Sequence, residues 1–330
     1  MAPGGTARHA LAAADSFKGT FRSAEVNAAI AEAFEAAGWT GEALSVADGG
    51  EGTMEALVSA LGGSYHVAQA ADPLGRPVEA RWALLGDGRA VVEVAQASGL
   101  WRVAPGERDA WSASTYGTGE LIAAAAAARA KSVLIAAGGS ATTDGGAGAL
   151  RALERTGAEP DIDVICDVAT AWEDAAAVFG PQKGADPPTV ARLERRLDEL
   201  AERAPRDPRG VPLTGCAGGL SGGLWAFRDA RLLPGASFVL DAIGFDARLR
   251  DADLVVTGEG RLDRQTLAGK VVAEIARRCR LHDVACCAIV GERDLEDAEV
   301  RELGVARTLE ASTLAEIGER ASMLASRPPA

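Results

Sequence analysis

The first hydrophobic run of the chain introduces a plan of strand, turn and helix. Residues 9–14 are apolar and predict a strand, and the acidic, glycine-containing turn 15–19 follows it. Ser23 is a favourable N-cap for the next segment. Apolar residues then recur at helical spacing, namely Val26, Ile30 and Phe34. We therefore expect a helix that ends near Gly38.

The same plan returns immediately afterwards and again in the C-terminal third. The second copy comprises a strand over 42–46, a turn over 48–52 and a helix over 53–61. The third copy has a strand over 254–257 and a turn over 258–260. A helix with Leu267, Val271 and Ile275 on one face should follow, and then strands over 284–290 and 305–309. Such alternation is typical of a parallel sheet.

The middle of the chain has a different pattern. Three short strand-like runs, 65–69, 78–84 and 90–95, are separated by the turns 73–75 and 86–88. Turns of this kind suit antiparallel connections. The later middle elements should be a helix over 119–130, a strand over 133–137, a glycine-rich loop over 138–148, a strand over 164–167 and a helix with Val190, Leu193, Leu197 and Leu200 on one stripe.

These patterns predict an α/β protein of two domains. Residues 1–64 and 235–330 should form a discontinuous domain around a mostly parallel, Rossmann-like sheet. Residues 65–234 should form an inserted α/β domain with antiparallel pairs. We expect the active site in the cleft between the two, near the carboxyl ends of strands.

Composition and charge exclude several classes of protein. No apolar run approaches the roughly 18 residues of a membrane span, and no secretory signal is evident, so we expect a cytoplasmic protein. The formal net charge of −13 argues against nucleic acid and anionic membranes as partners. The five cysteines form no CxxC pair, which favours reduced, buried thiols over a zinc site. Oligomeric state is left open.

Lysine usage points towards phosphate. Only four of the 34 basic residues are lysines, and three of them, Lys18, Lys183 and Lys270, stand beside a glycine. A compact ammonium next to closely approachable backbone suits a phosphate oxygen.

Five glycine-rich or acidic loops could carry the chemistry. They span 15–19, 48–52, 138–146, 215–223 and 258–263. Backbone N–H groups in such loops can approach anions, whereas their carboxylates suit Mg²⁺ together with substrate phosphates. Phosphoryl transfer needs both kinds of group. The signatures of P-loop proteins, Rossmann dehydrogenases and protein kinases are absent from the sequence.

Ten collinear motifs then become recognisable. They are DSFKGT (15–20), ADGGEGT (47–53), DPLGRPVEA (72–80), ASGL (97–100), YGTGEL (116–121), GGSATTDGGAG (138–148), CDV (166–168), VFGPQKGA (178–185), GCAGGLSGGL (215–224) and TGEGRLDRQTLAGK (257–270). Together they resemble the bacterial glycerate kinase family. The resemblance implies an ATP-dependent phosphorylation of D-glycerate, usually to 2-phosphoglycerate, by two α/β domains.

The resemblance also carries site residues onto this chain. They are Asp15, Lys18, Asp48, Glu51, Ser140, Thr142, Asp144, Lys183, Glu259, Asp263 and Lys270. Chemistry suggests individual roles. Lys18 would clamp the phosphoryl group, and Glu259 with Asp263 would contact Mg²⁺. Gly49 and Gly50 would offer backbone to phosphate, and Arg76 or Arg261 would bind the glycerate carboxylate.

The base and the acceptor stay open at this point. Asp144 is our first candidate for the base, although it could instead accept backbone hydrogen bonds and shape its loop. Asp15, Asp167 and Asp263 are alternatives. The segment 169–174, directly after CDV, lacks the glycines that the family usually shows there. A kinase of another small hydroxy acid and a non-catalytic sensor of glycerate or nucleotide are therefore alternative functions. Which hydroxyl is phosphorylated is also left open.

Overall fold

The computed structural model describes residues 7–17, 19–267 and 269–329, which form two compact units. The first unit combines the residues up to Asp48 with those from Val239 onward, and the second runs from Gly49 to Phe238. Residues 49–64, which we predicted in the first domain, thus belong to the second unit. Hydrogen bonds tie this segment to the second unit, because Gly52 and Met54 donate their backbone N–H groups to Glu93 at 3.0 and 2.9 Å.

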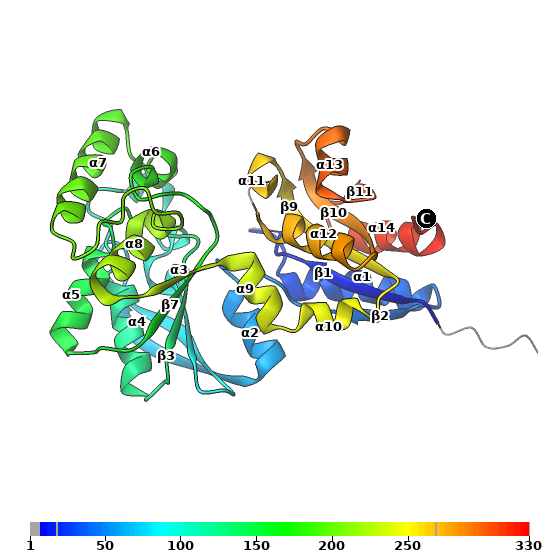
Figure 1. The fold of residues 1–330 in the computed structure, drawn as a ribbon, viewed down its shortest axis with the longest axis horizontal. Helices are drawn as coiled ribbons and strands as arrows, with labels where there is room; N and C mark the ends of the chain where they lie inside the picture. Colours follow the sequence, from blue (N-terminus) through cyan, green and yellow to red (C-terminus); the bar gives the residue numbers. More distant parts are fainter. Residues whose placement is uncertain (1–6, 18, 268, 330) are drawn as a thin grey trace, which may run out of the picture. The chain divides into compact units, whose positions relative to one another are not determined.

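The first unit contains a five-stranded sheet in the order β11-β10-β9-β1-β2, and all its pairs are parallel (Figure 1). The strands are β1 (His9–Ala14), β2 (Thr40–Ala43), β9 (Leu254–Leu262), β10 (Ala285–Arg293) and β11 (Arg307–Glu310). Its helices are α1 (Ser23–Ala36), α10 (Phe245–Leu249), α11 (Arg264–Leu267), α12 (Val271–Leu281), α13 (Asp297–Leu303) and α14 (Leu314–Ser326). Helix α9 (Gly235–Ala242) contains the second junction between the units.

Helices cover both faces of this sheet. Helices α1 and α14 share an apolar core with alternate strand residues, among them Cys287 of β10. The neighbouring Cys286 points the other way, and its thiol meets Cys279 of α12. The sheet is therefore doubly wound, as the alternating pattern predicted.

The second unit contains a six-stranded sheet in the order β3-β4-β5-β6-β7-β8. The β3–β4 and β4–β5 pairs are antiparallel and the others are parallel. The strands are β3 (Gly63–Ala71), β4 (Pro77–Leu85), β5 (Ala90–Glu93), β6 (Val133–Ala136), β7 (Ile162–Cys166) and β8 (Arg231–Pro234). The predicted fold class, a mostly parallel sheet plus a second α/β sheet with antiparallel pairs, is thus confirmed.

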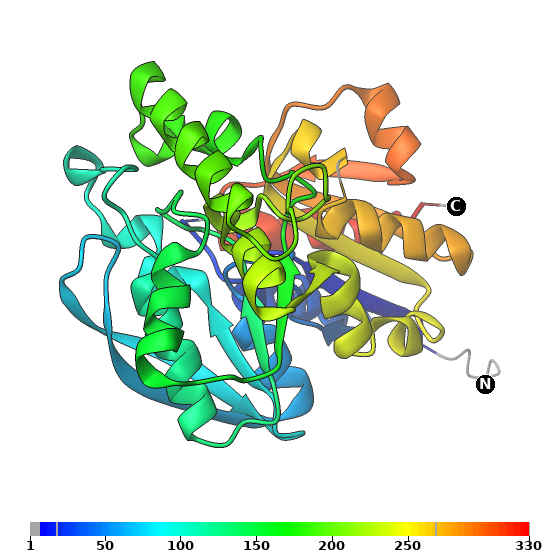
Figure 2. The ribbon, with the colours of Figure 1, turned by 60° about the vertical axis from the view of Figure 1, so that its left-hand side comes forward.

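Helices and short 3-10 turns complete the second unit. They are α2 (Thr53–Leu61), α3 (Val94–Ser98), η1 (Leu100–Arg102), η2 (Pro105–Glu107), α4 (Tyr116–Ala127), α5 (Ala147–Thr156), α6 (Ala175–Phe179), η3 (Pro181–Lys183), α7 (Pro187–Glu202) and α8 (Cys216–Arg228). Helices α4 and α5 run side by side (Figure 2) and join α8 in the main core with the sheet. No helix among the described residues has the length and apolar character needed to span a membrane.

One predicted turn is part of a strand, and one predicted loop is a kink with non-helical backbone where a helix begins. Residues 258–260 continue β9, because β10 runs alongside as far as the pair Arg293–Leu262. The glycine-rich segment 215–223 is the start of α8, whose Ala217, Gly218 and Gly219 have left-handed backbone angles. Side chains at Gly219 and Gly222 would meet the ring of Trp172, which is completely buried. These glycines therefore make room for an indole.

A buried amide fixes the carboxyl ends of β1 and β2. Asn27 of α1 is completely buried; its Oδ1 accepts the Ala14 N–H at 2.7 Å. Its Nδ2 donates to the carbonyls of Ala14 and Leu44, at 2.9 and 3.0 Å. Ser23, which we expected to cap the helix, instead donates its hydroxyl to the Ala14 carbonyl at 2.7 Å and accepts the Val46 N–H at 3.1 Å.

We predict that Asn27→Ala destabilises the protein by roughly 2–4 kcal/mol. The buried backbone groups of Ala14 and Leu44 would each lose a hydrogen-bond partner. Urea denaturation followed by circular dichroism measures the change. Glu32→Ala, at an exposed position of the same helix, is the matched control and should change stability by less than about 0.5 kcal/mol. A loss below about 1 kcal/mol in Asn27→Ala would show that these bonds contribute little.

Candidate active site

The topology of the first unit defines where a ligand should bind. From β1 the chain passes through α1 to β2 on one side, whereas from β9 it passes through α12 to β10 on the other. Strands β1 and β9 are parallel neighbours, and the order of successive strands advances in opposite directions away from them. In open α/β sheets, ligands bind outside the carboxyl ends of the strands at such a switch point.

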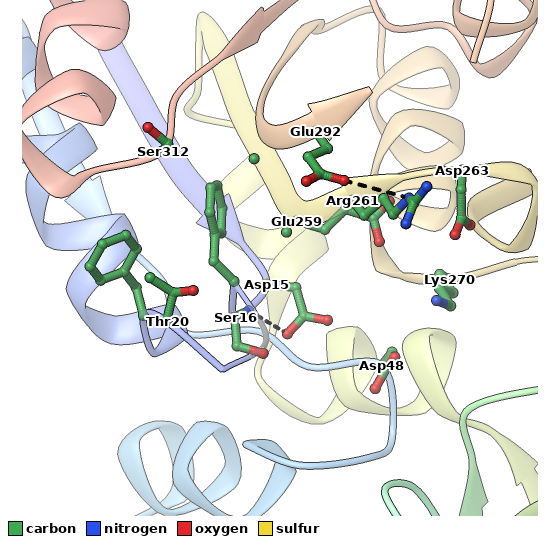
Figure 3. Close-up of a pocket in the computed structure, with 14 residues that line it drawn as sticks. Asp15, Ser16, Thr20, Asp48, Glu259, Arg261, Asp263, Lys270, Glu292 and Ser312 are labelled. Atoms are coloured by element: carbon green, nitrogen blue, oxygen red, sulfur yellow. Dashed lines mark hydrogen bonds and ion pairs between the residues drawn. The ribbon is translucent and has the colours of Figure 1, made fainter. Parts of the chain in front are cut away.

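A pocket of about 390 Å³ lies at this point. Five carboxylates line it, those of Asp15, Asp48, Glu259, Asp263 and Glu292, and so do the side chains of Lys270 and Arg261 (Figure 3). Asp15 directly follows β1 and donates its backbone N–H to the Gly258 carbonyl of β9 at 2.8 Å. Residues from three separate motifs of the sequence are thus brought together in one pocket.

Glu259 is the most perturbed group of this pocket. It is 8% exposed, and burial raises the pKa of its carboxyl to about 7. The Thr266 hydroxyl, which donates to Glu259 at 2.5 Å, and the Lys270 ammonium lower this pKa, whereas the charges of Asp263 and Asp48 raise it. The pocket therefore holds more negative charge than its lysine neutralises, and a cation would relieve that repulsion.

The donor set fits Mg²⁺ when phosphate oxygens complete it. Among residues 7–17, 19–267 and 269–329, no three His, Cys, Asp or Glu side chains gather closely enough to hold a metal by themselves. Mg²⁺ is commonly bound by one or two carboxylates plus substrate phosphates and water. Glu259 and Asp263 offer oxygen ligands of this kind, and Lys270 is available for an anionic oxygen.

A second cluster lies in the second unit, around the buried Lys183. Its ammonium donates to the Ser140 hydroxyl at 3.1 Å and to the Thr142 carbonyl at 2.6 Å. Burial lowers its pKa to about 8, and the nearby carboxylates of Asp144 and Asp167 oppose this shift. Lys183 has no ion pair within 4 Å in the described part of the chain. Ser140, Thr142 and Lys183, all carried over by the resemblance, therefore lie together, and the Lys183 ammonium can bind an anion.

Asp144, our first candidate for the base, is heavily engaged. Its carboxylate accepts the N–H and the hydroxyl of Thr115, both at 2.9 Å, and the N–H groups of Gly146 and Gly148, both at 3.1 Å. It is 6% exposed. These bonds favour the alternative in which Asp144 shapes the loop that presents Ser140 and Thr142.

The predicted arginines have partners of their own. Arg76 pairs with Asp72 at 2.5 Å and with Glu107 at 3.2 Å, which stabilises its turn. Arg261 pairs with Asp294 at 2.6 Å, although it also lines the pocket of the first unit. Lys18 lies outside the described residues.

The loop that begins at Gly49 is shaped by close packing. A side chain at Gly49 would meet the Cα of Gly235 at 2.8 Å, and its φ of +102° also favours glycine. The Cα of Gly50 lies where a side chain at Gly138 would project, and Glu51 approaches Gly139. These contacts explain the glycines without a ligand.

Glu93 was missed by the sequence analysis. It is 4% exposed, one of its oxygens accepts both Gly52 and Met54 N–H groups, and burial raises its pKa to about 7. A carboxylate at the end of the apolar run 90–92 was the available signal.

The doubly wound sheet has, in the pocket at its switch point, the carboxylates and the lysine that phosphoryl transfer needs. The sequence signature of the glycerate kinase family matches residues 10–158 and 154–326. The chain belongs to this family. The glycerate kinase of Halalkalibacterium halodurans is 37% identical, with 84% of each chain covered. The glycerate 2-kinase of Escherichia coli is 34% identical, with 89% of this chain and 87% of the relative covered.

A solved structure resembles the whole chain. A crystal structure from Salmonella typhimurium LT2, of a protein assigned as glycerate kinase 2, superposes with a TM-score of 0.79 at 34% identity. The match covers 97% of this chain and 96% of the other. It supports the fold of both units.

The raised pKa of Glu259 predicts a stability effect in the metal-free protein. The folded carboxyl titrates near 7 instead of 4.5, so the folded state binds more protons between these values and loses stability as pH rises through them. Glu259→Gln removes this loss and can still accept the Thr266 hydroxyl. We expect the variant to be roughly 1–3 kcal/mol more stable at pH 8 and nearly equal to the wild type at pH 4.5.

Urea denaturation at both pH values measures this difference. Glu292→Gln, an exposed side chain that lines the same pocket, is the control and should show no pH-dependent gain. If Glu259→Gln is as stable as the wild type at pH 8, the carboxyl is not held under strain by burial.

Proposed function

We propose that the chain transfers the γ-phosphoryl group of ATP to D-glycerate, with 2-phosphoglycerate as product and Mg²⁺ as the metal. The pocket at the switch point supports this proposal most directly, because carboxylates and a lysine around a small space meet the needs of phosphoryl transfer. The family supports glycerate as acceptor. The name of the Escherichia coli relative, glycerate 2-kinase, supports the 2-hydroxyl.

In the proposed reaction, a hydroxyl oxygen of glycerate forms a bond to the γ-phosphorus, and the bond from that phosphorus to the oxygen shared with ADP breaks. Bound Mg²⁺ would neutralise charge on the phosphate oxygens. Glu259 and Asp263 would hold it, and Lys270 would contact a phosphate oxygen. The hydroxyl proton would pass to Asp15, which lines the same pocket and is 6% exposed. We keep Lys18 as a second phosphate contact.

The cluster around Lys183 would bind an anionic group of a substrate. The Lys183 ammonium has three N–H groups, and two of them donate to Ser140 and Thr142. The third can donate to an anionic group, which would balance the buried charge. With a net charge of −13, the chain needs local cations to hold anionic substrates. Lys183 provides one.

A panel of hydroxy acids tests the proposal. The purified protein is incubated with ATP, Mg²⁺ and, separately, D-glycerate, L-glycerate, glycolate, lactate and tartronate, and ADP release is followed. We expect D-glycerate to be preferred by at least about tenfold in kcat/KM, since a site that hydrogen-bonds a hydroxyl rejects analogues lacking it. ³¹P NMR of the product identifies the phosphorylated hydroxyl, and excess chelator should stop turnover.

Other results of the panel point elsewhere. Preference for another acid would indicate that the altered segment 169–174 has changed the substrate specificity. In this segment Trp172 is buried, and its indole N–H donates to the Leu197 carbonyl at 3.1 Å. Binding of glycerate and nucleotide without any ADP release would favour a sensor. Turnover in excess chelator would remove the metal from the proposal.

Lys270→Ala should lower kcat by roughly 10²–10³-fold, because it removes a charge from the developing phosphoryl transition state. Lys131→Ala is the matched control: Lys131 is exposed and donates to the Asp87 carbonyl at 2.7 Å, in the second unit. Steady-state kinetics at saturating ATP and glycerate measure both. Equal kcat values in the two variants would exclude Lys270 from catalysis.

A further inference from the structure

A second basic feature of the second unit lies apart from the Lys183 cluster. A pocket of about 440 Å³ is lined by α5, α7 and the segment 111–114. Three guanidinium groups border it, those of Arg151, Arg196 and Arg203, and so do the hydroxyls of Ser112 and Ser114. Two carboxylates, those of Asp144 and Glu199, also line it, whereas Ser140, Thr142 and Lys183 do not.

The arginines of this pocket are poorly neutralised within the described part of the chain. Arg151, on α5, has no hydrogen bond or ion pair there. Arg196 has neutral partners: it donates to the Trp111 carbonyl at 2.7 Å, and its guanidinium lies 3.7 Å from the centre of the Trp111 ring. Arg203 pairs with the exposed Glu199 at 3.6 Å. Two of the three guanidinium groups, those of Arg151 and Arg196, thus have no carboxylate partner within 4 Å in the described part of the chain.

The surroundings of Arg196 do not supply a counter-charge. Burial lowers its pKa and the charge of Arg192 does the same, whereas the Asp144 and Asp109 carboxylates act against the shift without reaching salt-bridge distance. The Asp144 carboxylate already accepts hydrogen bonds from the N–H groups of Thr115, Gly146 and Gly148. The stacked Trp111 ring holds the Arg196 guanidinium in place, so little side-chain entropy would be lost when an anion binds.

We propose that this pocket is an accessory binding site for a small acid that carries two anionic groups, one for Arg151 on α5 and one for Arg196 on α7. Arginine binds planar carboxylates and phosphates with paired hydrogen bonds. The two serine hydroxyls can bond to further oxygens. A phosphorylated hydroxy acid has this chemistry; that choice of ligand rests on the proposed function, whereas the requirement for two anionic groups does not.

Tryptophan fluorescence of the full chain tests the site with 2-phosphoglycerate as the probe. Saturating ADP and D-glycerate are present throughout, so that the proposed catalytic site is occupied. We expect a saturable change in emission that is absent in Trp111→Phe, which keeps an aromatic ring for Arg196. Calorimetry under the same conditions should give one equivalent bound.

Three variants and two further ligands make the test specific. Arg151→Gln and Arg196→Gln should each weaken binding by roughly tenfold or more. Arg195→Gln, exposed on the same helix and not among the lining residues, should bind as the wild type does. Inorganic phosphate and lactate, with one anionic group each, should bind at least about tenfold more weakly than 2-phosphoglycerate.

Unchanged binding in Arg151→Gln and Arg196→Gln, or no binding beyond the occupied catalytic site, would overturn the proposal. Equal affinity for inorganic phosphate would overturn the requirement for two anionic groups. Failure of the proposed function is seen separately, as absence of ADP release in the hydroxy acid panel, and would leave this binding result standing.

Discussion

The buried amide of Asn27 is the interaction on which the candidate active site depends. Its hydrogen bonds to Ala14 and to the Leu44 carbonyl fix the positions of the carboxyl ends of β1 and β2. Asp15 is the next residue after β1, and its N–H reaches the Gly258 carbonyl of β9. One side chain, with Ser23 beside it, therefore sets the position of Asp15 against Glu259. Packing alone would hold these strands, but it would not fix their ends.

Charge is the second constraint. Five carboxylates share the pocket of the first unit with Lys270 and Arg261, and the pKa of Glu259 is raised mainly by burial and further by the charges of Asp263 and Asp48. A pocket of this kind is destabilising when empty and is completed by a cation and its phosphate ligands. The second unit has the opposite arrangement, because Lys183 is a buried cation that, among the described residues, forms no ion pair within 4 Å. Local fields of both signs thus exist in a chain whose net charge is −13.

Much of the fold could be predicted from the sequence, because the hydrophobic period changes wherever the element type changes. The strand over 9–14 and the helix over 53–61 have the predicted bounds. Local rules failed where a distant partner decides the structure. Residues 258–260 look like a turn, but β10 pairs with them. The glycines after residue 214 look like an anion loop, but Trp172, some 45 positions earlier, fills the space beside them. For the site, five residues that the family resemblance carried over line one pocket, namely Asp15, Asp48, Glu259, Asp263 and Lys270. The bonds from Arg76 to Glu107, from Thr115 to Asp144 and from Gly52 to Glu93 are tertiary contacts that no local pattern encodes.

The central claim is that the carboxylates at the switch point of the first unit hold a divalent metal together with nucleotide phosphates. Electron paramagnetic resonance of Mn²⁺, titrated into the protein with and without ADP, tests this claim directly. The predicted result is Mn²⁺ binding that requires ADP, persists in Glu292→Gln and is lost in the double variant Glu259→Gln, Asp263→Asn. Undiminished ADP-dependent Mn²⁺ binding in a correctly folded double variant would contradict the claim.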